Sequence, residues 1–194
     1  MNKLIFDSTV DDAELVRWSL LDPDKFSYLI NRYQDKLARY IRRLGNANNE
    51  DVEDILQDIF LKVYLNLNDF NQDLKFSSWI YRIAHNQVIS HFRKRQARPE
   101  AHSLPIDGDG LQLLADDIAL EHQSDLSLER EKINMALSRL EAKYREILIL
   151  KFFEDKSYQE ISDILKKPQG TVASLLNRAK KALKQALPEQ VSSF

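Results

Sequence analysis

The sequence predicts an all-α protein made of two small helical domains. Its 194 residues include only four glycines and five prolines, which is few for a chain built from strands and tight turns. Apolar residues recur every three or four positions through most of the chain, which is the spacing of amphipathic helices. One stretch lacks this periodicity and separates residues 1–98 from residues 128–194. We therefore expect two helical domains joined by a linker.

The N-terminal domain is expected to open with two helices. The first is short and is predicted from Asp12 to Leu21. Asp22 and Pro23 begin the second, because aspartate caps helix N-termini and proline fits the first helical position. Gly45 is the expected terminator of this second helix.

Two longer helices are predicted to complete this domain. One runs from about Glu50 to Leu67, and its apolar side includes Tyr64. The other begins near Ser77 and carries apolar residues at helical spacing as far as Phe92.

The predicted linker, residues 99–127, lies in a strongly acidic stretch. Residues 99–131 contain nine acidic side chains and one basic side chain, Arg130. The rest of the chain then has 27 Lys and Arg against 21 Asp and Glu, so the overall net charge of −2 conceals a basic remainder. The acidic stretch is either a solvated spacer or an element with its own role in function.

The C-terminal domain, residues 128–194, ends in a predicted helix-turn-helix. Two helices are expected ahead of it, around Leu126–Leu140 and Glu141–Phe153. Ser157 and Glu160 have the spacing of a capping box, which marks the start of its first helix.

Pro168 suits the first position of the second helix of this motif. That helix has a stripe of residues expected to be buried: Val172, Leu176, Ala179 and Leu183. No acidic residue occurs from Lys166 to Ala186. A basic second helix after a short turn is typical of a helix-turn-helix that reads DNA, and an ordinary helical hairpin with a lysine-rich solvated face is the alternative.

A second candidate nucleic-acid surface lies between Phe76 and Arg98. This block has five Lys and Arg, two histidines, several aromatic residues and no carboxylate. Such a combination suits single-stranded DNA, because cations meet phosphates while aromatic and amide groups meet unstacked bases. Alternatively, Trp79 and Phe92 belong to the core and the basic residues from Arg93 onward form a solvated helix end.

The third helix of the N-terminal domain carries an acidic patch. Glu53, Asp54, Gln57 and Asp58 lie within about one helical turn of each other beside apolar residues. The patch is either a solvated face or a docking surface for a basic partner.

Enzyme chemistry finds little support in the sequence. The chain has no cysteine, so a thiolate zinc site and disulfides are excluded. Its four histidines lack metal-binding helical spacing, and no glycine-rich phosphate loop or nucleophile turn is present. We expect no catalytic residue, no metal site and no cofactor. The absence of a signal peptide or a long apolar run predicts a cytoplasmic protein without membrane insertion.

Three ordered blocks resemble the sigma-70 family of RNA polymerase sigma factors, in its extracytoplasmic-function (ECF) group. Residues 51–64 (DVEDILQDIFLKVY) resemble region 2.2, which binds the β′ coiled coil of core RNA polymerase. Residues 76–86 (FSSWIYRIAHN) resemble regions 2.3 and 2.4, which open and read the −10 promoter element. The segments YQEI, PQGTV and NRAK, beginning at residues 158, 168 and 177, resemble region 4.2, which binds the −35 element.

This resemblance implies the site residues and the partners. The residues expected to bind core polymerase are Glu53, Asp54, Gln57, Asp58 and Leu61. Those expected to bind the −10 element are Lys75, Trp79, Arg82, His85, Asn86, Arg93, Lys94 and Arg95. Those expected to bind the −35 element are Gln169, Thr171, Ser174, Asn177, Arg178 and Lys181. The implied partners are bacterial core RNA polymerase (β′ coiled coil and β flap), duplex and single-stranded promoter DNA, and an anti-sigma factor.

The chain departs from the family pattern at two places in the second helix of the motif. Ala173 and Leu175 stand where family members often have basic residues, which puts the −35 sequence in question more than the function. Two other interpretations are open at this point. A stand-alone helix-turn-helix repressor would use the N-terminal helices for sensing or dimerisation, and a helical metalloenzyme would need ligands that the sequence does not space correctly.

Overall fold

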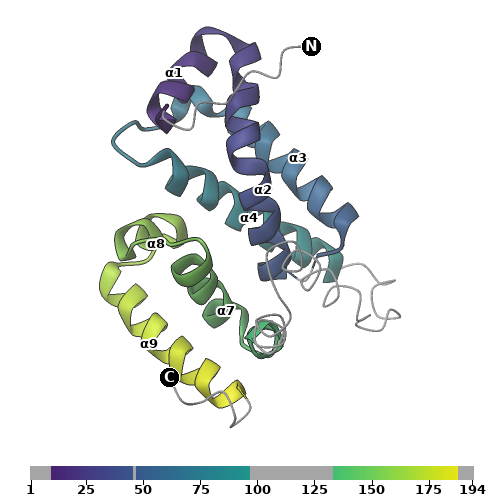
Figure 1. The fold of residues 1–194 in the computed structure, drawn as a ribbon, viewed down its shortest axis with the longest axis vertical. Coiled ribbons are helices and arrows are strands. Elements are labelled where there is room, and N and C mark those ends of the chain that lie inside the picture. Colours follow the sequence, from purple (N-terminus) through teal and green to yellow (C-terminus); the bar gives the residue numbers. More distant parts are fainter. Residues whose placement is uncertain (1–9, 46, 97–132, 188–194) are drawn as a thin grey trace, which may run out of the picture.

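A computed structural model of the chain describes residues 10–45, 47–96 and 133–187. Every regular element within these ranges is helical, so the predicted all-α class is confirmed (Figure 1). The predicted linker, residues 99–127, lies outside the described residues. None of the described helices is long and apolar enough to cross a membrane.

The N-terminal half forms a bundle of four α-helices with two short 3₁₀ turns. The elements are α1 (Asp12–Leu21), η1 (Pro23–Lys25), α2 (Phe26–Gly45), α3 (Asn49–Leu65), η2 (Leu67–Asp69) and α4 (Phe76–Gln96).

Capping residues set where these helices begin. The Asp11 carboxylate accepts the Glu14 N–H at 2.7 Å, and the Asn48 side chain accepts the Asp51 N–H at 2.7 Å. Asp22 and Pro23 begin the turn η1 rather than α2 itself, and η1 leads directly into α2. The observed helices therefore begin within a few residues of the predicted positions.

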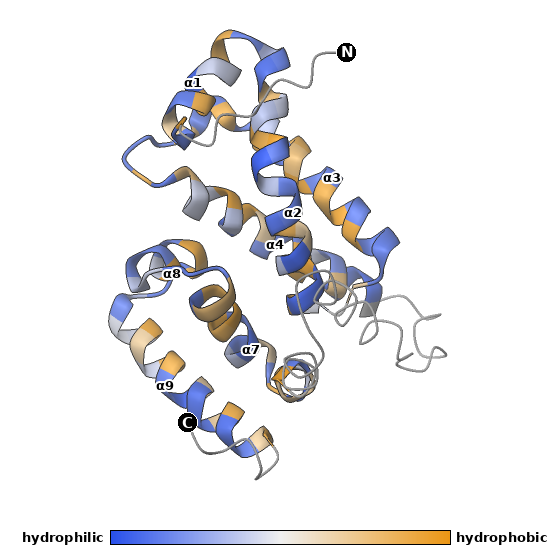
Figure 2. Cartoon of the chain, viewed as in Figure 1, coloured by the Kyte–Doolittle hydropathy of each residue, from blue (hydrophilic) through white to orange (hydrophobic). Residues whose placement is uncertain are grey.

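The core of this half lies between α2, α3 and α4. Helix α2 buries residues at helical spacing, among them Leu29, Leu37 and Ile41, each 0% exposed. From α3 and α4, Ile59 and Ile80 are buried to the same extent. Full burial of an aliphatic side chain of this size contributes about 1.5–3 kcal/mol, so this seam dominates the stability of the half. Figure 2 shows the apolar side of each helix turned inward.

The C-terminal half contains the predicted helix-turn-helix. Its elements are α7 (Ala142–Leu148), the π-helical turn η4 (Ile149–Phe153), α8 (Tyr158–Leu165) and α9 (Gln169–Ala186), and residues 133–138 are also helical. The capping box is present in both directions, with Glu160 N–H to Ser157 Oγ at 3.2 Å and Ser157 N–H to Glu160 Oε2 at 2.9 Å.

Helix α9 has the predicted buried stripe, with Val172, Leu176 and Ala179 buried and Leu183 half-buried. Pro168 occupies the N-cap position of α9, one residue earlier than predicted, because its ψ of 144° is extended rather than helical.

The two halves pack against each other. Helix α8 lies on α4, and α7 and η4 contact α2, while α9 packs on α7 and α8 (Figure 1). The buried side chains of both halves form one continuous apolar cluster. Helix α9 therefore lies on the outside of the C-terminal half, with α7 and α8 between it and the N-terminal bundle. No local pattern in the sequence predicts this packing.

Gly45 is the last residue of α2, as predicted, but the reason for a glycine there differs from the predicted one. None of the described glycines has a positive φ, so Gly45 does not use the left-handed conformation of a glycine cap. A Cβ at this position would overlap the Phe92 ring of α4. Glycine is required here because α2 and α4 approach closely at this point.

Replacing Gly45 with alanine should lower the free energy of unfolding by about 1–3 kcal/mol, because the added methyl group overpacks the contact with Phe92. Urea unfolding of the full chain measures the change. Gly170→Ala in α9 is the matched control, since a Cβ at that position would have no neighbour within 4 Å and the helix should gain up to about 1 kcal/mol. Equal effects of both substitutions would contradict this explanation.

Candidate nucleic-acid interface

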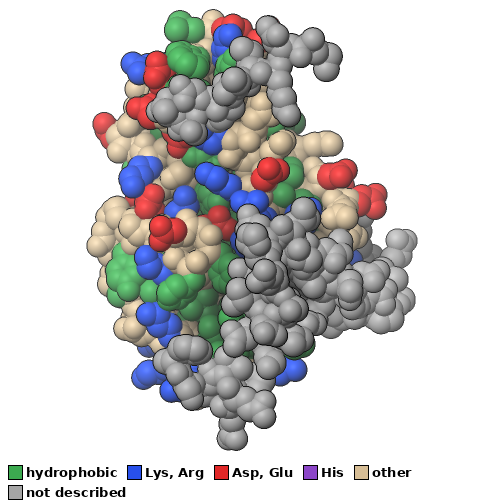
Figure 3. Space-filling view, viewed as in Figure 1, with side chains coloured by type: hydrophobic (Ala, Val, Ile, Leu, Met, Phe, Trp, Pro, Cys, Tyr) green, Lys and Arg blue, Asp and Glu red, His purple; other side chains and the backbone are tan. Residues whose placement is uncertain are grey.

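Helix α9 presents the predicted DNA-reading residues to solvent. Gln169, Thr171, Ser174, Asn177, Arg178 and Lys181 are all exposed. They lie away from the buried stripe that docks α9 onto α7 and α8, so the helix can enter a groove without losing its packing. Figure 3 shows Lys and Arg side chains along the lower left edge of this face, where α9 lies.

Hydrogen bonds across the helix-turn-helix hold the start of α9 in place. The Gln169 side chain donates to the Gln159 amide oxygen of α8, and Gln159 in turn donates to Asp163 at 3.1 Å. The Ser162 hydroxyl donates to the Lys167 carbonyl at 2.6 Å. The first turn of α9 therefore has a defined direction relative to α8.

The turn between α8 and α9 contains a non-glycine residue in the left-handed region. Lys166 caps α8 with φ 53° and ψ 45°, and its N–H bonds to the Ser162 carbonyl. A side chain in this conformation costs about 1–2 kcal/mol relative to right-handed backbone. Glycine is the common residue at such a cap, so lysine here lowers stability while adding a cation next to α9.

The acidic patch on α3 is exposed as a whole. Glu53, Asp54, Gln57, Asp58 and Leu61 all face solvent, and Leu61 is 57% exposed. The same face continues into Tyr64 and Leu65, which are 45% and 66% exposed. Tyr64 was expected on the buried side, but it is exposed, and its ring meets the Phe26 ring edge to face. Figure 3 shows acidic side chains at the right-hand edge, over the first turns of α3.

Leu65 is a candidate that the sequence prediction missed. It lies one helical turn beyond Leu61, so the two leucines form an apolar end to the acidic face. The resemblance gave a role to Leu61 and none to Leu65, and the exposure of Leu65 in the structure is what reveals it.

The predicted −10 residues on α4 have different environments. Lys75, Asn86, Arg93 and Lys94 are exposed, and Arg82 is half-buried. Trp79 is only 8% exposed and packs against Phe70 and Phe76, so in this conformation its ring supports the core and cannot stack on a base. The structure thus favours the core role for Trp79 over the predicted DNA contact.

Asp51 ties the end of α4 to the start of α3. Its carboxylate meets His91 Nε2 at 3.1 Å and Arg95 at 2.7 Å. Arg95 is therefore held by α3, whereas Arg93 and Lys94 extend from the exposed side of the same turn. Of the predicted basic cluster, Arg95 is thus paired within the bundle, and Arg93 and Lys94 are exposed.

His85 faces the C-terminal half instead of solvent. Its Nδ1 lies in hydrogen-bond contact with Glu146 of α7, and the same carboxylate oxygen accepts from Tyr40 at 3.0 Å. Glu146 is only 6% exposed. Burial, followed by the neighbouring Glu146 charge, raises the pKa of Tyr40 well above its ordinary value, so the hydroxyl remains a donor.

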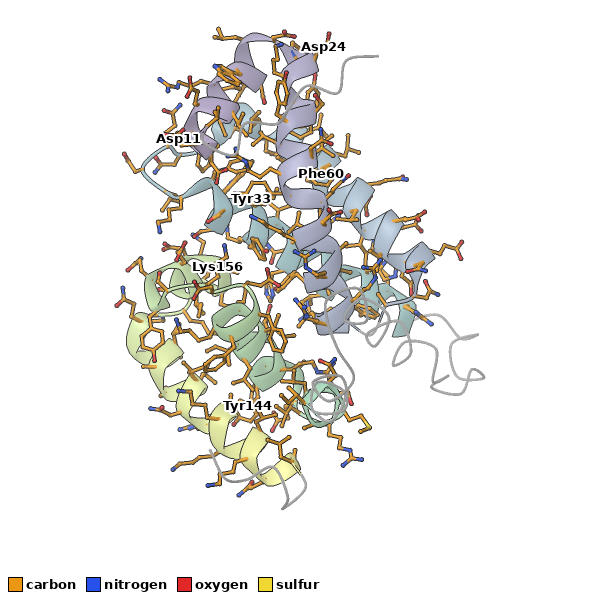
Figure 4. The ribbon with its side chains drawn as sticks, in the orientation of Figure 1. Asp11, Asp24, Tyr33, Phe60, Tyr144 and Lys156 are labelled. Carbon is orange, nitrogen blue, oxygen red and sulfur yellow. The ribbon has the colours of Figure 1, made fainter. Side chains whose placement is uncertain are left out.

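A second buried carboxylate lies beside the first. Glu154, at the end of η4, accepts from the Tyr81 hydroxyl and from Arg43 at 3.3 Å. Burial raises the pKa of Tyr81, and the Glu154 charge adds to this effect. The Lys156 ammonium lies 4.4 Å from the centroid of the Tyr81 ring, at the junction of the two halves (Figure 4). Burial lowers the pKa of Lys156.

At the other end of this junction, Lys75 meets Glu160 at 3.3 Å. Burial opposes the charge of Glu160, but hydrogen bonds from Ser157 and Lys75 outweigh it and lower its pKa. Glu160 is therefore ionised in the folded protein at neutral pH, and it serves the capping box and the junction together.

Two family models match the chain in the order of its two halves. "Sigma-70 region 2" matches residues 29–98, and "Sigma-70, region 4" matches residues 130–183. The ECF RNA polymerase sigma factor SigW of Bacillus subtilis is 34% identical over 172 residues, covering 86% of this chain and 90% of that protein. The chain belongs to the ECF group of the sigma-70 family. It is a sigma factor and not a stand-alone repressor.

Other relatives agree with this assignment. The RNA polymerase sigma-H factor of Pseudomonas aeruginosa is 30% identical over 86% of this chain and 88% of that protein. The fold resembles CnrH, solved in complex with the cytosolic domain of CnrY, with a TM-score of 0.65, 22% identity and coverage of 90% and 95% of the two chains. It also resembles the Bartonella quintana sigma factor RpoE, solved with the anti-sigma factor NepR, with a TM-score of 0.61, 23% identity and coverage of 83% and 95%.

Within residues 10–45, 47–96 and 133–187, no group of three or more His, Asp or Glu side chains is arranged to hold a metal ion. The candidate surfaces among the described residues are the exposed faces of α3, α4 and α9.

Replacing Lys166 with glycine should raise the free energy of unfolding by about 0.5–1 kcal/mol, because glycine adopts the left-handed cap without a Cβ penalty. Thermal and urea unfolding of the full chain measure the gain. Lys167→Gly removes the same charge one residue later, where φ is not positive, and should give no gain. A similar change in both variants would show that the left-handed backbone is not the cause.

Proposed function

We propose that this sigma factor directs bacterial core RNA polymerase to promoters, with α3 docking on the polymerase, α4 opening and reading the −10 element and α9 reading the −35 element. The observation that carries this proposal is the exposed, carboxylate-free α9, with all six predicted residues facing solvent, in the same chain as the exposed α3 face. The polymerase performs nucleotidyl transfer, and this chain selects where it starts. We place the protein in the cytoplasm, where that enzyme works.

The direct test mixes the purified chain with core RNA polymerase and genomic DNA, and maps the 5′ ends of the transcripts. Transcripts that start at shared upstream sequences only when the chain is present support the proposal. Transcription that is unchanged by the chain refutes it. The mapped ends themselves identify the promoters, so none has to be chosen beforehand.

The α3 face is suited to a basic, partly apolar coiled coil. Its carboxylates supply charge that steers association, and Leu61 and Leu65 supply apolar area that a partner helix can cover. Helix α3 packs mainly against α2 and α4 of its own region. Among the described residues, region 4 does not cover its acidic face.

Reversing the charge of Asp54 and Asp58 to lysine should weaken binding to core polymerase at least about tenfold, or about 1.4 kcal/mol, because both are exposed on the docking face. Fluorescence anisotropy with labelled sigma factor measures the affinity. Asp24→Lys with Asp35→Lys makes the same charge change at exposed positions of η1 and α2 and should leave the affinity unchanged. Equal weakening by both pairs would reduce the patch to a general charge effect.

We propose that Arg178 and Asn177, both exposed on α9, read bases of the −35 element, since arginine pairs with guanine and asparagine with adenine in the major groove. In the same proposal, the exposed Lys181 and Lys184 contact the DNA backbone. Ala173 and Leu175 remove cations that the family often has, so we propose that region 4 binds DNA weakly by itself and depends on polymerase for placement.

Arg178→Ala should reduce discrimination among −35 variants by about 1–3 kcal/mol, because a bidentate base contact is lost. Transcription by the holoenzyme on a series of −35 substitutions measures it. Lys184→Ala is the control, and it should lower activity to a similar degree on every variant, since a phosphate contact carries no base identity. The base-reading role fails if Arg178→Ala also acts uniformly.

The remaining assignments follow the same scheme. On α4, we propose that Asn86 contacts a base edge of the opened −10 element and that Arg93 and Lys94 contact phosphates. The acidic linker is proposed to act near the polymerase active site and RNA exit path, beyond tethering. Because both solved relatives described above were captured with a protein bound, we also propose that an anti-sigma factor regulates this chain.

A further inference from the structure

The two sides of α9 that flank its exposed face differ in charge. One side carries Lys180, whose ammonium lies 5.4 Å from the centroid of the Phe152 ring in η4. The opposite side carries Leu175, Arg178 and Ala182, which are three or four positions apart and so are neighbours on the helix surface. Leu175 and Ala182 are half-buried and apolar, whereas Arg178 is exposed. Of these three residues, Arg178 is therefore the one that can reach a charged ligand.

A helix that lies in the major groove has a DNA strand on each side of it, and phosphate contacts to the strands fix its position. On the Lys180 side, α9 has a lysine of its own for such a contact. On the opposite side, the proposed function assigns Arg178 to a base. The phosphates on the Arg178 side then need a cation from an element next to α9.

Helix α7 has an exposed lysine beside this side of α9. The two helices pack on each other, and Tyr144 of α7, labelled in Figure 4, is partly buried against the same apolar cluster as Leu175. The side chain of the preceding residue, Lys143, is exposed. Its hydrogen bond to Glu141 raises the pKa of Lys143, and the charge of Arg178 opposes this rise. The two cations are therefore near enough to act on one ligand backbone.

In the structure, Lys143 is paired with a carboxylate of its own region. Its Nζ lies 2.6 Å from Glu141 Oε2, and the two side chains are 53% and 64% exposed. An ion pair this exposed is weak, because water and salt screen both charges. The lysine stem is also flexible, so the ammonium can exchange the carboxylate for a phosphate. Glu141 consequently competes with DNA for Lys143.

We propose that Lys143 of α7 binds a backbone phosphate of the −35 element on the Arg178 side of α9, and that Glu141 holds Lys143 in the free protein. This inference rests on the proposed function, since it adds a positioning residue to the helix-turn-helix. A phosphate contact carries no base identity, so Lys143 fixes where α9 lies and leaves the reading of bases to α9. The DNA-binding surface of region 4 then extends from α9 to the first turn of α7.

The test titrates holoenzyme, made with the full chain, into a labelled promoter duplex found in the transcript mapping. Fluorescence anisotropy gives the affinity at several salt concentrations. Lys143→Gln should weaken binding about three- to tenfold and reduce the slope of log K against log salt concentration by about 0.9, the change for one phosphate contact. Lys143→Arg keeps the charge and should keep the wild-type slope. Lys36→Gln is the matched control, because Lys36 is also exposed and beside a tyrosine ring but lies in region 2, and it should keep the wild-type slope.

Glu141→Gln tests the competition between carboxylate and phosphate. In the wild-type background it should strengthen promoter binding about two- to fivefold, because Lys143 is released to the DNA. In the Lys143→Gln background the same substitution should have no effect, since its partner is already absent. Equal strengthening in both backgrounds would mean that Glu141 acts only through its general charge, and the pairing role would be lost.

A wild-type salt slope for Lys143→Gln would overturn the phosphate contact. A loss of binding confined to particular −35 variants would also overturn it, because a phosphate contact weakens binding to every variant alike. The proposed function fails separately, if the wild-type chain with core polymerase gives no promoter-dependent transcripts. That result is obtained with the wild-type chain alone, so the two failures are distinguishable.

Discussion

The burial of α4 on both of its sides is the constraint on which the rest of the structure depends. One side completes the core of region 2 with α2 and α3, through residues such as Ile80, Ala84 and Val88. The other side receives region 4 through α8 and the carboxylates of α7 and η4. The helix must therefore be apolar on one face and polar on the other, and this explains why it has aromatic, hydroxyl and imidazole groups but no carboxylate.

The two faces of α4 differ in the free energy that exposing each of them to water would cost. The apolar face buries aliphatic and aromatic side chains, so exposing it would unfold region 2. The junction with region 4 contains buried carboxylates that need every donor they have, and such groups are costly to leave unpaired but are readily solvated when the interface opens. The junction is consequently the more polar of the two interfaces, although apolar side chains of both regions also meet there.

Acidic and basic residues are concentrated on different surfaces of the protein. Acidic residues are concentrated on α3 and in residues 99–131, whereas α9 has none. The net charge of −2 therefore says little about DNA binding, since only the local field near each surface acts on a partner within a Debye length of about 8–10 Å. The same logic applies at the junction, where three carboxylates from an otherwise basic region 4 contact α4.

Local patterns in the sequence determined the helices, the capping box at Ser157 and Glu160, the buried stripe of α9 and the family, because each depends on residues close together in the chain. The assignments of α3, α4 and α9 to partners come from the resemblance and remain predictions. Only the tertiary structure decided that Gly45 lies in close approach to Phe92 and that Leu65 is exposed, and it selected the core role for Trp79 from the two alternatives that the sequence offered. It also decided that Glu146 and Glu154 meet Tyr40, Tyr81 and His85. These contacts join residues 61 to 106 positions apart, and no local periodicity records which carboxylate will face which hydroxyl across two separately patterned domains.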